Sequence, residues 1–416
     1  TGYPWQGGNS PKATGLLMII MKKENKKTKG IIMKKTFFKK LFTASIAAIT
    51  ALFVFRGVPT FADDTSATTM ATGENNAVVK INKTLNIAEG ITTPTATFTF
   101  TFTEKEGTSS NGAPYQKGVN IPNRTVKYSK DDTQVNNKIV KATDNIFDGV
   151  TYNHAGEYVY VVKEEKSGWS ALEKDGKKID SMRYDTRTYD MHVIVKNKTS
   201  NGVYISSVYF KENKTSSAGK VEPSGTGVYD LFDNTYAKDA SRDPNPENPD
   251  KINPTAKALT ITKKVDGASG DKTKDFHFHI HIQLPNTNST AESPLKMLVV
   301  QHGETSNTIA VLSSGIVDYD FTLKHGETFT IDQLPAGSHY TLTETGVPGY
   351  TASSVYLTNG TSTNGAAGQL GQDYKVENIL LGEKTNNNTV TNKINDVTPT
   401  GLLIDNLPFI LMIGLG

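Results

Sequence analysis

Alternating hydrophobic and polar residues recur along the chain from about residue 77 to residue 394. Six of these runs are residues 95–103, 156–164, 189–197, 275–282, 328–334 and 339–345. Because successive side chains of a strand point to opposite faces, this period of two predicts half-buried β-strands. Gly, Asn, Asp and Ser gather between the runs as turn residues. No longer stretch has a helical period, so the pattern predicts an all-β chain of the sandwich type.

A proline-rich segment, residues 241–257, interrupts the strands. Its four prolines and many charged residues are typical of a stiff, exposed linker. The linker separates residues 63–240 from residues 258–396, and each part has the size of a domain. Each part opens on a strand with lysines, later has an aromatic strand that ends in Glu, and closes on a strand with an Asn. We therefore expect two tandem β-sandwich domains.

Strand parity places three polar residues of each half on an otherwise apolar face. In the two halves they are Lys83, Glu164 and Asn234, and Lys263, Glu344 and Asn392. The separation from Lys to Glu is 81 residues in both halves. A buried ammonium and a buried carboxylate are costly unless they pair or become neutral. The repeat therefore calls for a chemical explanation.

Three interpretations of these trios are open. They are buried ion pairs with a hydrogen-bonded Asn, or bulges break the parity and the groups face water. The third is a self-formed amide bond, which the repetition in matching order favours. Desolvation lowers the pKa of Lys and raises that of Glu, so a neutral amine attacks the Asn carbonyl while a protonated Glu moves protons as ammonia leaves. Such a cross-link is worth about 5 kcal/mol in the chain-entropy model.

Several segments carry a family resemblance: LTITKKV (259–265), the Y-x-L-x-E strand ending at Glu344, TNK (391–393) and PTG (399–401). They resemble the isopeptide-linked domains of streptococcal backbone pilins of the T-antigen type. The resemblance implies Ig-like sandwiches of the collagen-adhesin B type. It also implies bonds between Lys83 and Asn234 with Glu164 as catalyst, and between Lys263 and Asn392 with Glu344. Lys80 and Lys264 are alternative nucleophiles, but both have the opposite parity.

The N-terminal part is typical of a secretory signal at residues 33–62. Residues 33–40 are basic, residues 41–55 are apolar but short for a membrane span, and cleavage is expected after Ala62. Arg56 keeps an N-terminal membrane anchor as the alternative. Residues 1–32 are interpreted as an upstream segment outside the native protein.

The C-terminal part resembles a sortase sorting signal, since Pro399, Thr400 and Gly401 directly precede an apolar tail. Thr398 departs from the family pattern, and the tail lacks the basic residues that usually end it, so we expect a truncated tail. A plain Thr/Pro loop is the alternative. The resemblance implies cleavage between Thr400 and Gly401 by a class C-type sortase. It also implies attack by a lysine of another copy, for which we select Lys220 over Lys211 and Lys214.

The expected function is therefore that of a structural subunit of a covalently polymerised pilus, secreted and anchored to the cell wall. Its expected partners are the sortase, further copies of itself, and peptidoglycan or a base pilin, with host surface molecules as a further class. The alternative is a wall-anchored adhesin or stalk with the same domains. A secreted enzyme is disfavoured because the only catalytic-looking trios point into separate cores.

Charge and composition narrow the remaining classes. Residues 63–400 hold 34 basic and 40 acidic residues, and this acidic body argues against nucleic-acid binding. The chain has no cysteine, which excludes disulfides and thiol chemistry. His277, His279 and His281 share one strand face, which we expect to be exposed. No acidic run lies near them in sequence, so we expect neither a metal nor another cofactor.

Overall fold

The computed structural model describes residues 67–214, 219–285, 297–302, 305–310 and 315–394. All of them belong to one unit, residues 64–416. Within these residues the chain is all-β, as predicted, and the 3-10 helix η2 (Pro249–Lys251) is a short turn between strands. No helix among them has the length and apolar sequence needed to cross a lipid bilayer.

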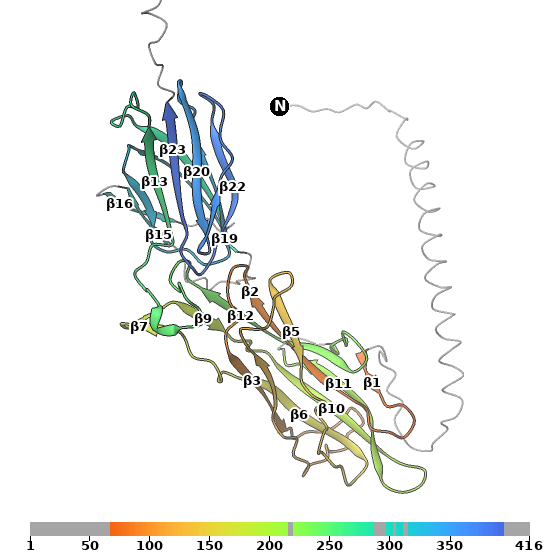
Figure 1. Ribbon diagram of the computed structural model, residues 1–416. Coiled ribbons are helices and arrows are strands. Elements are labelled where there is room, and N and C mark those ends of the chain that lie inside the picture. The colour runs from red at the N-terminus through yellow and green to blue at the C-terminus, as the bar shows by residue number, and fades with distance from the viewer. Residues whose placement is uncertain (1–66, 215–218, 286–296, 303–304, 311–314, 395–416) are drawn as a thin grey trace, which may run out of the picture. The chain divides into compact units, whose positions relative to one another are not determined.

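The first sandwich consists of two facing sheets (Figure 1). One sheet has the order β1-β11-β10-β6-β3-β4 and the other β5-β2-β12-β9, with β7 and β8 as a separate hairpin. The strands are β1 (Thr69–Met70), β2 (Lys80–Ile87), β3 (Ala96–Glu104), β4 (Arg124–Tyr128), β5 (Lys138–Ala142), β6 (Gly156–Glu165), β7 (Glu173–Lys174), β8 (Lys177–Lys178), β9 (Asp180–Arg183), β10 (Thr188–Asn197), β11 (Val203–Glu212) and β12 (Val228–Lys238).

The second sandwich also has two sheets, in the orders β16-β15-β18-β13-β23-β20-β21 and β17-β14-β19-β22. Its strands are β13 (Leu259–Asp266), β14 (Phe276–Gln283), β15 (Met297–His302), β16 (Thr305–Ala310), β17 (Ile316–Leu323), β18 (Thr328–Ile331), β19 (Ser338–Glu344), β20 (Tyr350–Thr358), β21 (Thr361–Asn364), β22 (Tyr374–Leu381) and β23 (Asn387–Ile394). The prediction of Ig-like tandem sandwiches agrees with this architecture.

The first long strand and the last strand of each sandwich lie side by side and run parallel. In the first sandwich β2 pairs with β12, and Lys83 lies opposite Phe232. In the second sandwich β13 pairs with β23, and Val265 lies opposite Asn392. Residues at the two ends of each domain sequence are thereby brought into one sheet.

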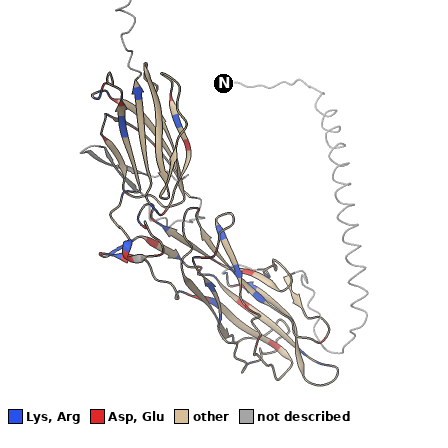
Figure 2. Cartoon of the chain, in the orientation of Figure 1, with Lys and Arg blue, Asp and Glu red and all other residues tan. Residues whose placement is uncertain are grey.

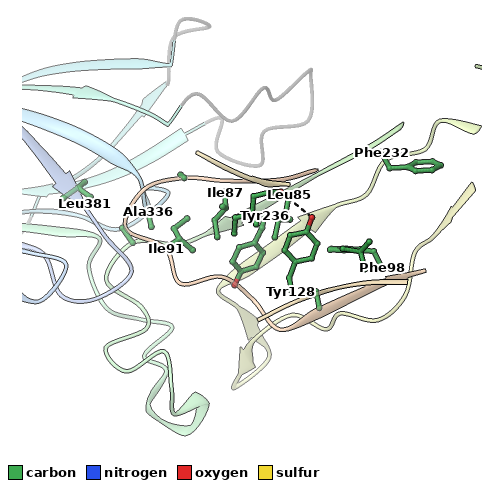
Figure 3. Packing of buried hydrophobic residues seen from close by; sticks show 14 of the residues in the cluster. Leu85, Ile87, Ile91, Phe98, Tyr128, Phe232, Tyr236, Ala336 and Leu381 are labelled. Atoms are coloured by element: carbon green, nitrogen blue, oxygen red, sulfur yellow. Dashed lines mark hydrogen bonds between the residues drawn. The ribbon is translucent and has the colours of Figure 1, made fainter. Parts of the chain in front are cut away.

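The cores follow the alternation of the sequence. Strand β2 buries every second side chain, and its Leu85 and Ile87 belong to the same buried cluster as Tyr236 and Phe98 (Figure 3). The Tyr128 hydroxyl donates a 2.6 Å hydrogen bond to the backbone oxygen of Lys83, which ties the facing sheets together beside the lysine. Ile81 and Leu85, which flank Lys83 on the same strand face, are fully buried.

Strand β14 has the two faces predicted for it. Its buried face carries Phe276, Phe278, Ile280 and Ile282, of which none is more than 3% exposed. The three histidines lie on the opposite, solvent-facing side. Figure 2 shows basic and acidic residues interspersed along the strands.

The proline-rich segment departs from the sequence prediction at its start. Ser241, Arg242 and Asp243 are buried, so full exposure of the linker was wrong. The backbone N–H groups of Ser241 and Asp243 donate to the carbonyls of Gly382 and Glu383. Because backbone pairing continues past the end of β12, the first residues of the linker are part of the folded structure.

Candidate functional site

The first domain brings its predicted trio together in the core. Lys83 on β2 and Asn234 on β12 come from one sheet, and Glu164 on β6 comes from the facing sheet. The Lys83 Nζ donates to Glu164 Oε2 at 2.7 Å, and Asn234 Nδ2 donates to Glu164 Oε1 at 2.5 Å. One carboxyl group therefore holds both the amine and the amide.

The second domain repeats this arrangement with a different contact. Lys263 Nζ donates to Asn392 Oδ1 at 2.5 Å and lies 2.9 Å from Glu344 Oε1. The Lys and Asn again belong to the parallel pair β13–β23, and the Glu belongs to β19 of the facing sheet. The amine contacts both the amide oxygen and the carboxyl group here, whereas in the first domain it donates to the carboxyl group.

All six residues are buried, as parity predicted, so the interpretation that bulges turn them to solvent was wrong. A bulge does occur in β12 between Asp230 and Phe232, but it lies before Asn234 and leaves the trio facing inward. Of the alternative nucleophiles, Lys264 is exposed and Lys80 is half-buried, on the other strand face.

Burial shifts the pKa values of the Lys and the Glu in both trios in the direction that favours their neutral forms. It lowers the pKa of Lys83 and of Lys263 to about 8, although the neighbouring Glu acts in the opposite direction. Burial also raises the pKa of Glu164 and of Glu344 against the effect of the lysines. Aromatic rings complete the apolar surroundings, with Lys83 Nζ 4.9 Å from the Phe98 ring centre.

Such a site suits nucleophilic acyl transfer within the chain. The neutral amine is the nucleophile, the Asn side-chain carbonyl is the electrophile, and the carboxyl group lies where it can pass a proton from the one nitrogen to the other. The six residues are at most 7% exposed, so the groups within reach of each amine belong to the protein itself.

The predicted inter-subunit lysine lies beside the C-terminal end of strand β11. Lys220 and Lys211 pair in an isolated bridge, and their Nζ atoms lie 4.7 and 5.8 Å from the Tyr209 ring centre. Lys214 pairs with Glu212 at 2.7 Å. The signal segment and the sorting residues Pro399, Thr400 and Gly401 lie outside the described residues.

The histidine face has acidic neighbours that the sequence did not reveal. His279 Nδ1 lies 2.7 Å from Asp320, and His281 Nδ1 lies 2.7 Å from Asp318. Both aspartates belong to β17, which pairs with β14. In the described part of the chain, no three His, Cys, Asp or Glu side chains form a group that could hold a metal ion.

A third buried lysine was missed by the sequence analysis. Lys238, at the end of β12, donates to Asp243 Oδ2 at 2.6 Å and to Glu383 Oε2 at 2.7 Å. All three side chains are at most 3% exposed. Glu383 follows β22 and also accepts a hydrogen bond from the backbone N–H of Thr92 at 3.1 Å.

Comparison with known families agrees with this geometry. Residues 79–237 match the family described as Spy0128-like isopeptide containing domain. The first domain is therefore similar to this isopeptide family. Residues 257–393, which span the second trio, match a domain of unknown function, DUF7601. The isopeptide family thus coincides with the domain in which parity placed Lys83, Glu164 and Asn234.

Whole-chain comparisons lead to pilins. A pilin of Streptococcus pyogenes serotype M1 is 26% identical over 353 residues, which is 81% of this chain and 87% of the relative. Among solved structures, the major pilin T3.2 of S. pyogenes is 20% identical with a TM-score of 0.33 and covers 79% of this chain and 100% of its own. Another S. pyogenes major pilin is 24% identical with a TM-score of 0.32, covering 77% and 99%. The chain is thus similar in sequence to a streptococcal pilin over most of its length.

Proposed function

We propose that the protein is a structural subunit of a cell-surface pilus whose two domains are each closed by an internal amide bond. The observation that carries this proposal is the buried Lys, Glu and Asn trio that both sandwiches repeat across the first and last strands. The similarity to pilins and to the isopeptide family supports it.

The proposed bonds join Lys83 to Asn234 and Lys263 to Asn392. The amine nitrogen attacks the side-chain carbonyl carbon, the C–N bond to the amide nitrogen breaks, and one ammonia leaves per bond. Glu164 and Glu344 take the proton from the amine and deliver it to the leaving nitrogen. Desolvation of the lysines supports the required neutral amine.

The mass of the protein tests these bonds directly. We expect residues 63–400, expressed and purified, to be lighter than the sequence mass by two ammonia molecules. Glu344→Ala or Lys263→Ala reduces the deficit to one, and Lys264→Ala, the neighbour on the other strand face, leaves it at two. A full sequence mass in the unmodified protein would refute the amide bonds and leave the trios as buried ion pairs.

Polymerisation is the second part of the proposal. A class C-type sortase cleaves between Thr400 and Gly401, and the Thr400 carbonyl is transferred to Lys220 of another copy, with attachment to peptidoglycan or a base pilin at the end. Lys220 pairs with Lys211 at the end of β11 rather than lying in a core, which leaves the sandwich intact when it is acylated. The product is a head-to-tail polymer that is secreted and held at the cell wall.

A gel assay with the cognate sortase tests this step. We expect a ladder of covalent multimers from the wild type and none from Lys220→Arg, while Lys211→Arg and Lys214→Arg serve as matched controls. If the ladder persists in Lys220→Arg and disappears in one of the controls, that other lysine is the acceptor. A ladder that survives all three substitutions places the acceptor outside this segment.

A further inference from the structure

The two trios differ in what contacts the carbonyl oxygen of the asparagine. In the second domain the contact is Lys263 Nζ itself, at 2.5 Å from Asn392 Oδ1. In the first domain the backbone N–H of Asp185 donates to Asn234 Oδ1 at 2.8 Å. The amine of Lys83 is held by Glu164 instead, so the carbonyl oxygen and the nucleophile have separate partners.

This oxygen is the atom on which negative charge develops during amide formation. When an amine attacks a carbonyl carbon, the electron pair of the C=O bond moves to the oxygen. A fixed N–H donor at hydrogen-bond distance stabilises that charge without having to reorganise, as in an oxyanion hole. We propose that the backbone N–H of Asp185 is the oxyanion donor for the Lys83–Asn234 bond.

A reciprocal clamp holds this N–H in place. The Asp185 carboxylate accepts hydrogen bonds from the backbone N–H groups of Asp233 and Arg187, both at 2.8 Å. The backbone N–H of Asp185 in turn reaches the residue next to Asp233 on β12. The loop between β9 and β10 is therefore fastened on both sides of the reacting amide.

Arg187 fixes the carboxylate of this clamp. Its guanidinium donates to Asp185 Oδ2 at 2.5 Å and to Asp233 Oδ2 at 3.2 Å. Burial opposes ionisation of Asp185, but the hydrogen bonds from Arg187 and from the Asp233 N–H outweigh it and lower the pKa of the carboxyl group. Arg187 acts on the reaction through Asp185 and is a positioning residue.

The bonds and protons of the proposed step are accounted for by the side chains of the trio alone. The Lys83 nitrogen forms a bond to the Asn234 Cγ, and the carbonyl electron pair moves to Oδ1, where the Asp185 N–H binds it. Glu164 takes a proton from the Lys83 nitrogen and gives one to Nδ2. The electron pair then returns from Oδ1, the bond from Cγ to Nδ2 breaks, and ammonia leaves. This inference rests on the proposed isopeptide chemistry, because without that reaction there is no charge for the N–H to stabilise.

Asp185→Pro removes the N–H, and Asp185→Ala keeps the N–H but removes the carboxylate, which makes it the matched control. The full chain is synthesised in a cell-free reaction, samples are quenched in acid at increasing times, and the two cross-linked peptides are quantified by mass spectrometry. The rate at which the Lys263–Asn392 peptide forms in the same molecule is the internal reference for the rate of the first bond.

We expect Asp185→Pro to slow the Lys83–Asn234 bond about a hundredfold, at the lower end of the cost of losing one oxyanion donor. The rate of the Lys263–Asn392 bond stays unchanged, and Asp185→Ala slows the first bond much less than Asp185→Pro. If proline prevents folding of the first domain, an ester link that replaces only the N–H of residue 185 gives the same test.

Three results overturn the inference. If Asp185→Pro or the ester slows the first bond no more than Asp185→Ala does, the N–H only satisfies a buried carbonyl. If neither cross-linked peptide forms in the wild type, the isopeptide proposal itself fails and this inference fails with it. Formation of both bonds at wild-type rates in the ester variant refutes the oxyanion role alone.

Discussion

Two kinds of buried lysine occur in this protein, and they differ in their charge partners. Lys83 and Lys263 each face one carboxyl group and aromatic rings. Lys238 faces two carboxylates, Asp243 and Glu383. Burial alone therefore does not distinguish a reactive lysine from a structural one.

The difference lies in the charge balance around the amine. With a single carboxyl group, a proton can move from the amine to the acid, and both groups become neutral in an apolar core. Lys238 instead donates hydrogen bonds to two acidic side chains, and such a network of paired groups offsets the cost of burying them. We therefore interpret Lys238, Asp243 and Glu383 as a structural ion-pair cluster and the core trios as amide-forming sites.

The largest expected effect comes from removing a core lysine. Lys83→Met prevents the first amide bond, so we expect the mass deficit to fall from two ammonia molecules to one. The unfolding free energy falls by about 5 kcal/mol because the unfolded chain is no longer closed into a loop. Urea unfolding and intact mass check this, with Lys80→Met as control. A deficit that stays at two ammonia molecules in Lys83→Met would show that another amine forms the bond.

A smaller loss is expected from Lys238→Met. It leaves two buried carboxylates without their cation, which costs about 3–5 kcal/mol in urea unfolding. The deficit of two ammonia molecules stays the same, since Lys238 forms no amide. If the wild-type protein is lighter by one further water molecule, Lys238 is bonded to Asp243. Lys238 would then also form an amide, and the distinction between the two kinds of lysine would be wrong.

The third prediction concerns pH in a protein whose first lysine stays free. In Asn234→Ala the folded pKa of Lys83 is lowered to about 8, below its unfolded value of 10.5. Between these values the unfolded chain binds more protons than the native one, so stability rises with pH, by roughly 3 kcal/mol in all. Urea unfolding from pH 7 to 11 checks this. We expect no such rise in the wild type, where the proposed amide bond leaves Lys83 without a titrating amine, and a rise there would contradict the bond.

The smallest effect is expected on the exposed face of β14. His279 and its partner Asp320 form a pair of which the histidine side chain is 46% exposed. Solvent screens such pairs, so His279→Gln changes the unfolding free energy by no more than about 0.5 kcal/mol. Thermal unfolding of this variant measures how much an exposed pair contributes to stability, for comparison with the buried pairs. A loss comparable to that of Lys238→Met would show that the exposed pair has a structural role.

Parity was sufficient to predict the all-β fold and the six trio residues, because alternation is a local property of a strand. The same argument extends to Lys238, which shares a strand face with Asn234 and Tyr236, so this lysine could have been found. Its partner Glu383 lies 145 residues away, and only the tertiary structure brings the two together. The prediction of an exposed linker failed because Ser241 and Asp243 also bind residues that are distant in sequence, Gly382 and Glu383.

Two further features had no sequence signal. The N–H of Asp185 belongs to the backbone, and any residue other than proline would provide it, so residue identity says nothing about its role. The aspartates beside the histidines come from β17, and their position depends on the pairing of β14 with β17. Sequence reasoning fails where a contact depends on which strands are neighbours.

The parallel pairing of first and last strands determines how each domain responds to a pulling force. The chain enters β2 at one end of the pair and leaves β12 at the other, so a pull on the two ends loads the strands in shear. With an amide between Lys83 and Asn234, the force passes from β2 to β12 through a covalent bond. The residues between them then carry no force, and the domain transmits tension without extending.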